Sequence, residues 1–344
     1  MIILPYILIF IFSISILFFL IIFKNKFSFI IDDVRDDERK IHSKQIIKVG
    51  GLTFLSLSLI LLFIENFILI QIIISSFIFL LIGFYADINQ NFSSYLRLIL
   101  STVIILIFMS VNNLVILNVD LTQINNILIT YSAISIFFTL ICLLIIINGL
   151  NFIDGNHGLM LGASIIMLMN ILLSLNDKSN EIELMLIATI IVLSILFLFN
   201  VISSNIIAGD TGAYFMGFMI GSVCIYINDL KLINPFHIAC ILFYPVMEVV
   251  VSSIRRVFFY KKNPFYPDSM HMHSIIFKKL KGRYIKKNEA NVDQLNFLTS
   301  VIILTYLVVV SVFIFMSSNY HVTFYLVCVS YISIYLTLYY FHKK

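Results

Sequence analysis

Two polar islands interrupt this very apolar chain at residues 148–158 and 208–213, and their residue types suggest a site for a phosphorylated, metal-bound ligand. Each island falls where one hydrophobic segment ends and the next begins. Asp and Asn side chains supply the oxygen ligands that a hard cation prefers, and glycines let the backbone approach a ligand closely. The candidate site residues in the islands are Asn148, Asn151, Asp154, His157 and Asp210.

Three further polar clusters lie at the edges of apolar segments and add acidic, basic and imidazole groups. They comprise Lys40, His42 and Gly50-Gly51 in the first, Asp87 and Arg97 in the second, and His271 and His273 in the third. Each cluster alone could be a turn, a helix end or a solvated loop. As a set, their cations suit phosphate oxygens, and their carboxylates suit Mg²⁺, with Mn²⁺ as the alternative. The combination suggests metal-assisted phosphoryl transfer at a membrane surface.

Other site chemistries fit this sequence less well. The four cysteines lie inside apolar segments and no His-x-x-x-His pair occurs, so a zinc site is not favoured. Neither a Walker A loop nor a Gly-x-Gly-x-x-Gly turn after a strand is found. Glu248 lies inside an apolar segment. An acid in such a segment is a functional-site candidate, unless it only pairs with a nearby base such as Arg255.

The elements that must position these residues are membrane helices. Of the 344 residues, 61% are hydrophobic and 12% are charged, and the mean hydropathy is +1.06. Apolar runs long enough to cross a bilayer recur along the chain. We therefore predict an all-α polytopic membrane protein that forms a single integral membrane domain over residues 1–344. The eleven transmembrane helices are expected at about 3–23, 49–66, 67–86, 97–118, 126–147, 158–175, 182–202, 212–228, 235–254, 296–316 and 322–341.

The basic residues predict the orientation of these helices. With eleven spans, 20 of the 22 Lys and Arg residues fall on one side of the membrane, and only Lys178 and Lys231 fall on the other. Because basic residues accumulate in cytoplasmic loops, we expect the N-terminus outside and the C-terminus in the cytoplasm. Every polar cluster is then cytoplasmic. The loops expected to form the active site are at about 24–48, 87–96, 148–157, 203–211 and 255–295.

The order and spacing of the polar motifs resemble those of the polyprenyl-phosphate N-acetylhexosamine-1-phosphate transferases, glycosyltransferase family 4. This superfamily includes the bacterial undecaprenyl-phosphate GlcNAc-1-phosphate transferases and the phospho-MurNAc-pentapeptide translocase. The resemblance covers about residues 30–280. The motifs that carry it are Arg39-Lys40-Ile-His42 with Gly50-Gly51, Gly83-Phe-x-x-Asp87 with Arg97, Asn148-x-x-Asn151-x-x-Asp154-Gly155, Gly209-Asp210-x-Gly212, and His271-x-His273.

The resemblance implies a reaction and its participants. The phosphate of a polyprenyl (undecaprenyl) lipid would attack the sugar-bearing phosphate of a UDP-sugar, releasing UMP and initiating synthesis of a cell-envelope glycan such as cell wall, lipopolysaccharide or O-antigen. The implied cofactor is Mg²⁺, or Mn²⁺ in its place. The implied location is the bacterial inner membrane with a cytoplasmic active site. The expected partners are the lipid phosphate, the UDP-sugar and the bilayer, with a homodimer left open and no nucleic acid.

The resemblance also assigns roles to individual residues. Asp210 corresponds to the family's Mg²⁺-binding aspartate, with Asn151 as a second ligand, and Asp87 to the second member of an aspartate pair. His271 and His273 correspond to a motif that holds substrate phosphates. The implied catalytic residues are Asp87, Asp154, Asp210, His271 and His273. The implied substrate-binding residues are Lys40, His42, Arg97, Asn148, Asn151 and His157.

The chain departs from the family pattern at three positions: Lys48 replaces a frequent proline–arginine context, and two further positions differ, of which Ala86 keeps a catalytically silent function open. Ala86 stands where the family usually has the first aspartate of the pair, and His157 stands where it usually has Asp or Asn. A phosphomonoester with a second pKa near ~6 is largely ionised at neutral pH, so a missing base is compatible with transfer. A catalytically silent relative that binds lipid-linked sugar is one alternative. A lipid-linked sugar transporter or flippase is another, although carrier sites tend to lie near the membrane midplane in paired repeats.

Overall fold

The computed structural model describes residues 3–26, 28–32, 45–89, 91–175, 180–203, 205–259, 261, 270–284 and 291–343. Most of these residues are helical, and several of the helices are apolar and long enough to cross a bilayer. The predicted class, an all-α polytopic membrane protein, is therefore confirmed. Two of the predicted site residues, Lys40 and His42, lie outside the described residues.

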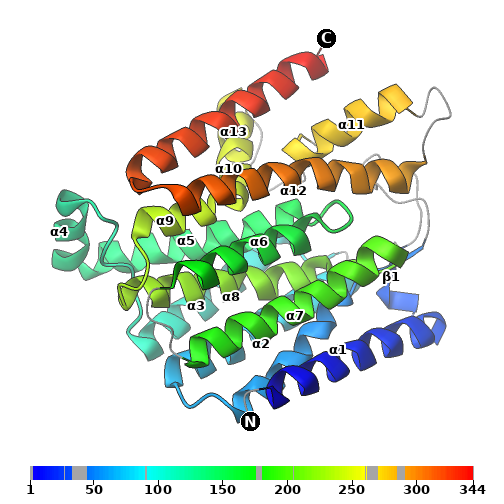
Figure 1. Ribbon diagram of the computed structural model, residues 1–344, viewed down its shortest axis with the longest axis horizontal. Coiled ribbons are helices and arrows are strands. Elements are labelled where there is room, and N and C mark those ends of the chain that lie inside the picture. Colours follow the sequence, from blue (N-terminus) through cyan, green and yellow to red (C-terminus); the bar gives the residue numbers. More distant parts are fainter. Residues whose placement is uncertain are drawn as a thin grey trace.

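The bundle consists of helices that lie roughly side by side (Figure 1). They are α1 (Leu4–Phe23), α2 (Phe67–Ile88), α3 (Ser94–Asn112), α4 (Thr122–Thr130), α5 (Ser132–Ile153), α6 (Leu159–Ser174), α7 (Asn180–Ser203), α8 (Gly209–Asp229), α9 (Pro235–Ile241), α10 (Phe243–Ile254), α11 (Met272–Tyr284), α12 (Val292–Met316) and α13 (Tyr320–Lys343). The shorter elements are the 3₁₀ helices η1 (Lys24–Lys26), η2 (Ser28–Ile30) and η3 (Gly50–Leu62), the π-helical turn η4 (Arg255–Phe259), and the strands β1 (Ile31–Asp32) and β2 (Ile46–Ile47).

The predicted spans each coincide with a helix or a helix pair. Within the described residues, eight helices are individually long and apolar enough to cross a membrane. A ninth span is formed if α9 and α10, which meet at a bend of 73°, are counted as one. Two shorter apolar helices, η3 and α6, coincide with the remaining predicted spans. The count of eleven and the orientation stay predictions.

Several helices run past the apolar segments into the polar islands, which corrects the predicted loops at 148–157 and 203–211. Helix α5 extends to Ile153, so Asn148 and Asn151 are helical, and α8 begins at Gly209, so Asp210 lies in its first turn. The predicted span 126–147 is also divided, because α4 ends before Tyr131 and α5 begins after it. The reason is that polar residues end an apolar segment without ending the backbone hydrogen bonds of a helix.

Helix α8 lies at the centre of the bundle, between α2 and α5 (Figure 1). Its hydropathy is the lowest of the eight spans, yet 94% of its membrane window is buried, because it is surrounded by other helices. Stacked rings hold it in place. Phe215 packs on Phe54 with centroids 4.9 Å apart, and Phe218 packs on Phe79 at 4.6 Å. The rotation of α8, and with it the direction of Asp210, is set by this packing.

The backbone before α8 is held by the segment that follows the first polar cluster. Ile47 donates to the carbonyl of Asn205 at 2.8 Å, and Ile207 donates back to Ile47 at 2.9 Å. The N–H groups of Gly50 and Gly51 continue this ladder to Ile207 and Ala208, both at 2.9 Å. Two segments far apart in sequence therefore converge on the start of α8.

Gly83 of α2 marks the closest approach between α2 and α8. A Cβ at this position would lie 2.2 Å from the Asp210 carbonyl oxygen, so the two helices could not keep their separation. We expect Gly83→Ala to lower the free energy of unfolding in detergent by roughly 1–3 kcal/mol, as overpacked cores do. Gly282→Ala is the matched control, because a Cβ there meets nothing within 4 Å. Equal stability of the two variants would contradict this packing.

Labelling can test the predicted orientation. Asn91 is exposed at the end of the bundle where α2 ends and α3 begins, and Asp229, the last residue of α8, is exposed at the opposite end. In intact bacterial cells, we expect a membrane-impermeant thiol reagent to label Asp229→Cys at once and Asn91→Cys only after permeabilisation. The native cysteines would first be replaced by Ser or Ala. The reverse pattern would overturn the predicted topology.

Candidate active site

The carboxylate of Asp210 is at the centre of the polar site. Its Oδ2 accepts from Arg97 Nη1 at 2.6 Å and its Oδ1 accepts from Asn151 Nδ2 at 2.6 Å. These partners come from α3 and α5, so three helices meet at this one side chain. The Asp210 side chain is still 29% exposed, so solvent and a ligand can reach it. The structure thus brings together Arg97, Asn151 and Asp210, three of the predicted site residues.

Asp87, near the end of α2, is bound to the first turn of α8. Its carboxylate accepts from the backbone N–H groups of Asp210 and Thr211, at 3.1 and 2.8 Å, and from the Thr211 hydroxyl at 2.5 Å. A carboxylate is favourable at the positive N-terminal end of a helix, where the N–H groups have no partner within the helix. Asp87 is therefore an N-terminal cap supplied by another helix. Sequence reasoning did not assign any role to Thr211, although it lies within the polar motif.

Gly209, where α8 begins, allows this capping arrangement. Its φ of +69° is in the left-handed region, which favours glycine. A Cβ at Gly209 would also lie 1.8 Å from the carbonyl oxygen of Lys48 and 2.7 Å from a carboxylate oxygen of Asp87. A glycine is therefore required here for both the backbone conformation and the close approach.

Asp154 follows α5 and joins the same acidic group. The Gly209 N–H donates to its carboxylate. Burial raises the pKa of Asp154 well above its ordinary range, and the negative charges of Asp87 and Asp210 raise it further. A cation bound in this region would favour the ionised form of Asp154. Asn148 lies one turn before Asn151, and its Nδ2 donates to Leu144 within the helix at 2.7 Å.

The two histidines pack against the end of α5. The rings of His271 and His273 are stacked, with centroids 5.6 Å apart and planes 6° apart. The His271 ring lies 5.0 Å from that of Phe152, and a Cβ on Gly155 would be 2.9 Å from Nε2 of His273. The two histidines of this predicted cluster lie side by side, but His273 is in the first turn of α11, so the predicted loop at 255–295 is partly helical. Phe152 is a neighbour that sequence reasoning missed.

His157 is on the inner side of the α5–α6 connection. It is only 1% exposed, and its backbone N–H donates to Asn296 Oδ1 of α12 at 2.9 Å. Burial lowers the pKa of His157, which the negative charge of Asp293 partly opposes. The structure thus ties the polar island to α12 at His157, while the predicted role of this residue in substrate binding remains a prediction.

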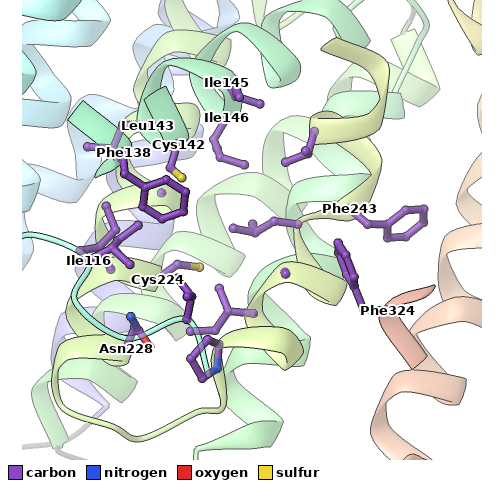
Figure 2. Close-up of a pocket in the computed structure, with 18 of the residues that line it drawn as sticks. Ile116, Phe138, Cys142, Leu143, Ile145, Ile146, Cys224, Asn228, Phe243 and Phe324 are labelled. Atoms are coloured by element: carbon purple, nitrogen blue, oxygen red, sulfur yellow. The ribbon is translucent and has the colours of Figure 1, made fainter. Parts of the chain in front are cut away.

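An apolar cavity of about 270 Å³ lies among the membrane helices, between α5, α8, the α9–α10 pair and α13 (Figure 2). Phe138 and Ile146 of α5, Cys224 of α8 and Phe324 of α13 line it. Ile145 also lines the cavity and is six residues before Asn151. This separation corresponds to roughly 9 Å along the helix axis. The cavity therefore extends along the same helix that carries the polar site.

The residues present fit a magnesium ion held together with a substrate. Among the described residues, no group of three or more His, Cys, Asp or Glu side chains is arranged to hold a metal. Mg²⁺, however, is usually bound by one or two carboxylates together with phosphate oxygens and water. Asp210 is partly exposed, and the amide of Asn151 beside it could turn to present its oxygen. These are the two residues that could hold the ion.

Comparison with known proteins finds a similar family and two similar proteins, each over part of the chain. Residues 69–228 match the family described as glycosyl transferase family 4. A probable undecaprenyl-phosphate N-acetylglucosaminyl 1-phosphate transferase of Bacillus subtilis (strain 168) is 33% identical over 133 residues, 37% of this chain and 36% of the relative. An undecaprenyl-phosphate alpha-N-acetylglucosaminyl 1-phosphate transferase of Thermotoga maritima is 28% identical over 137 residues, 39% of this chain and 40% of the relative.

The matched parts span well under half the length of either curated relative. They are also shorter than the resemblance expected from the motifs, which extended from about residue 30 to 280. The family match nevertheless contains α2, α3, α5 and α8, and with them the partners that surround Asp210. Over residues 69–228, a little under half of its 344 residues, the chain is thus similar to glycosyl transferase family 4.

Proposed function

We propose that this chain transfers a sugar-1-phosphate, an N-acetylhexosamine phosphate, from a UDP-sugar to polyprenyl (undecaprenyl) phosphate and releases UMP. The observation that carries the proposal is the convergence of Asp87, Arg97, Asn151, Asp154 and Asp210 on one end of a membrane bundle. The two curated relatives, both named as undecaprenyl-phosphate N-acetylglucosaminyl 1-phosphate transferases, support the same reaction class. The reaction would begin a cell-envelope glycan at the cytoplasmic face of the bacterial inner membrane.

The chain's own groups can hold a diphosphate through opposite charge. Arg97, next to Asp210, is 22% exposed and could exchange one of its N–H donors to a phosphate oxygen. His271 and His273 are the other nitrogen donors near the end of α5. Mg²⁺, or Mn²⁺, bound by Asp210 and Asn151 would stabilise the negative charge that develops on the transferred phosphate.

No separate general base is needed for the attack. The attacking group is a phosphomonoester, which is already largely ionised at neutral pH because its second pKa is about 6. Asp87 also has its carboxylate oxygens bound to three donors of α8, so its part in the reaction is to hold Asp210 in place. This view accommodates Ala86, since a second carboxylate would not be required as a base.

The apolar cavity suits the lipid substrate. A polyprenyl chain must remain in an apolar environment while its phosphate reaches the polar end of the bundle. The cavity among α5, α8, the α9–α10 pair and α13 would hold part of that chain, and its end at Ile145 lies one to two turns from Asn151. Phosphate and hydrocarbon would then be bound along a single helix.

A transporter or flippase is the competing function from another class. Carriers tend to bind their cargo near the midplane, in broken helices of paired repeats. Here Asp87, Asp154 and Asp210 gather at helix ends, and the one bent pair among the described helices, α9 and α10, lines the apolar cavity. Purified protein incubated with a set of UDP-sugars, undecaprenyl phosphate and Mg²⁺ separates the classes. UMP release with formation of a lipid-diphosphate sugar supports the transferase, whereas movement of lipid-linked sugar without UMP release supports the carrier. Binding with neither supports a silent relative.

We expect Asp210→Asn to abolish transfer while the protein remains folded. The variant loses the negative charge proposed to hold the metal, and the barrier should rise by an amount on the order of several kcal/mol. UMP release measured over a range of Mg²⁺ concentrations checks this. Full activity at an unchanged Mg²⁺ dependence would reject Asp210 as the metal-binding residue.

Asp87→Asn should lower both stability and turnover, for a different reason. The amide group of Asn would point its N–H donors at the start of α8, which itself presents only N–H donors. The loss of a charge-assisted hydrogen bond should lower the free energy of unfolding by about 1–3 kcal/mol. The start of α8, and therefore Asp210, would be displaced. Asp229→Asn, at the exposed opposite end of α8, is the matched control. Melting temperature and UMP release are to be measured together, and wild-type values in Asp87→Asn would contradict the capping role.

A further inference from the structure

Helix α10 carries a buried acid to which the proposed reaction has so far given no part. Glu248 is only 1% exposed and sits among apolar and aromatic residues of the bundle. A carboxylate in such a place costs free energy unless both of its oxygens have partners. The identity of those partners therefore shows what the acid is for.

Both oxygens of Glu248 are bound to the segment that carries the two histidines. Oε2 lies 3.0 Å from Nδ1 of His271, and Oε1 accepts from the backbone N–H of Met272 at 3.2 Å. Arg255, seven residues along and so on the same side of the helix, donates to the Met270 carbonyl at 2.6 Å. Two charged residues of α10 and η4 thus fix residues 270–272.

These contacts set the direction of the His271 ring. An ionised carboxylate only accepts hydrogen bonds, so Nδ1 of His271 carries the hydrogen that Glu248 receives. Nε2 is then the ring nitrogen left to meet another group. The ring cannot easily rotate away, because Phe152 lies at 5.0 Å and the parallel ring of His273 at 5.6 Å. Glu248 therefore determines the orientation of the His271 ring and keeps a hydrogen on Nδ1.

We propose that Glu248 is a positioning residue that holds the imidazolium form of His271, so that its Nε2–H can donate to a phosphate oxygen of the nucleotide-sugar. The proposal rests on the transferase function given above and deepens it. Glu248 does not touch the substrate but acts through the imidazole. The same acid also lies close enough to Tyr244 and Tyr331 to interact with them electrostatically. A test must therefore separate the positioning of His271 from a general contribution to the bundle.

Glu248→Gln is the informative single substitution. The amide has the same shape, but its one oxygen can accept from only one of the two donors, His271 Nδ1–H or Met272 N–H. The ring can then turn or change tautomer. We expect the kcat for UMP release to fall roughly 10- to 100-fold, the size of effect seen when the partner of a metal-bound histidine is removed. The KM for undecaprenyl phosphate should change little, and Glu248→Asp, which keeps two acceptors, should recover part of the rate.

A double-mutant cycle identifies the residue through which Glu248 acts. If the carboxylate works only by orienting His271, then the combination of Glu248→Gln with His271→Ala should be no slower than His271→Ala alone. If Glu248 merely supports the fold, the rate of the double variant should fall by the product of the two single-variant rate losses. Multiplicative losses, or a wild-type rate in Glu248→Gln, would overturn the positioning role.

Glu181→Gln is the matched control variant. Glu181 also accepts two backbone N–H groups, those of Glu65 and Asn66, but it does so at the start of α2, at the opposite end of that helix from Asp87. Its substitution should leave transfer unchanged. Hydrogen–deuterium exchange of residues 270–273 adds a readout that needs no turnover. Exchange should rise in Glu248→Gln and stay at the wild-type level in Glu181→Gln.

The outcomes distinguish this inference from the proposed function. A wild-type protein that releases no UMP from any UDP-sugar would refute the transferase function, and with it a role for Glu248 in that reaction. An active wild type with unaltered rate or unaltered exchange in Glu248→Gln would refute the inference alone. Loss of rate, non-additivity with His271→Ala and faster exchange together would support it.

Discussion

The site depends on holding several carboxylates at the end of a membrane bundle, where an unpaired charge is costly. The first turn of α8 meets this constraint. Its free N–H groups bind the carboxylate of Asp87, while Arg97 and Asn151 bind that of Asp210. Asp87 joins α2 to α8, and Asp210 joins α8 to α3 and α5, so the charges that would meet a substrate also hold these four helices together. The contacts of Asp87 and Asp210 therefore hold the helices together and also position the groups proposed to act on a substrate.

The hydrogen bonds around Asp87 and Asp210 also require the helices to pack closely. Hydrogen bonds between helices form only if the backbones come near, which explains why Gly83 faces the Asp210 carbonyl and why Gly209 adopts a left-handed conformation beside Lys48. The central position of α8 then fixes the direction of Asp210 through buried aromatic contacts on several sides. A site residue on a surrounded helix is more precisely placed than one on a loop.

Acidic side chains elsewhere in the bundle are also bound to hydrogen-bond donors from a different part of the chain. Glu248 binds the His271 ring and the Met272 backbone, and Glu181 binds the backbone at the start of α2. Each acid accepts from backbone N–H groups of a turn or helix start that would otherwise lack a protein partner. Such contacts would let a bundle of apolar helices carry polar chemistry at its edge.

The sequence by itself determined the helical membrane class, the approximate position of each apolar segment, and the set of residues around Asp210, because hydropathy and motif spacing are local properties of the chain. Only the tertiary structure decided that Asn148 and Asn151 are helical, that Asp87 caps α8, that His157 is buried against α12, and that Glu248 has His271 as its partner. These features depend on the rotation and register of helices far apart in sequence. That geometry is set by side-chain packing, which no short stretch of the chain encodes.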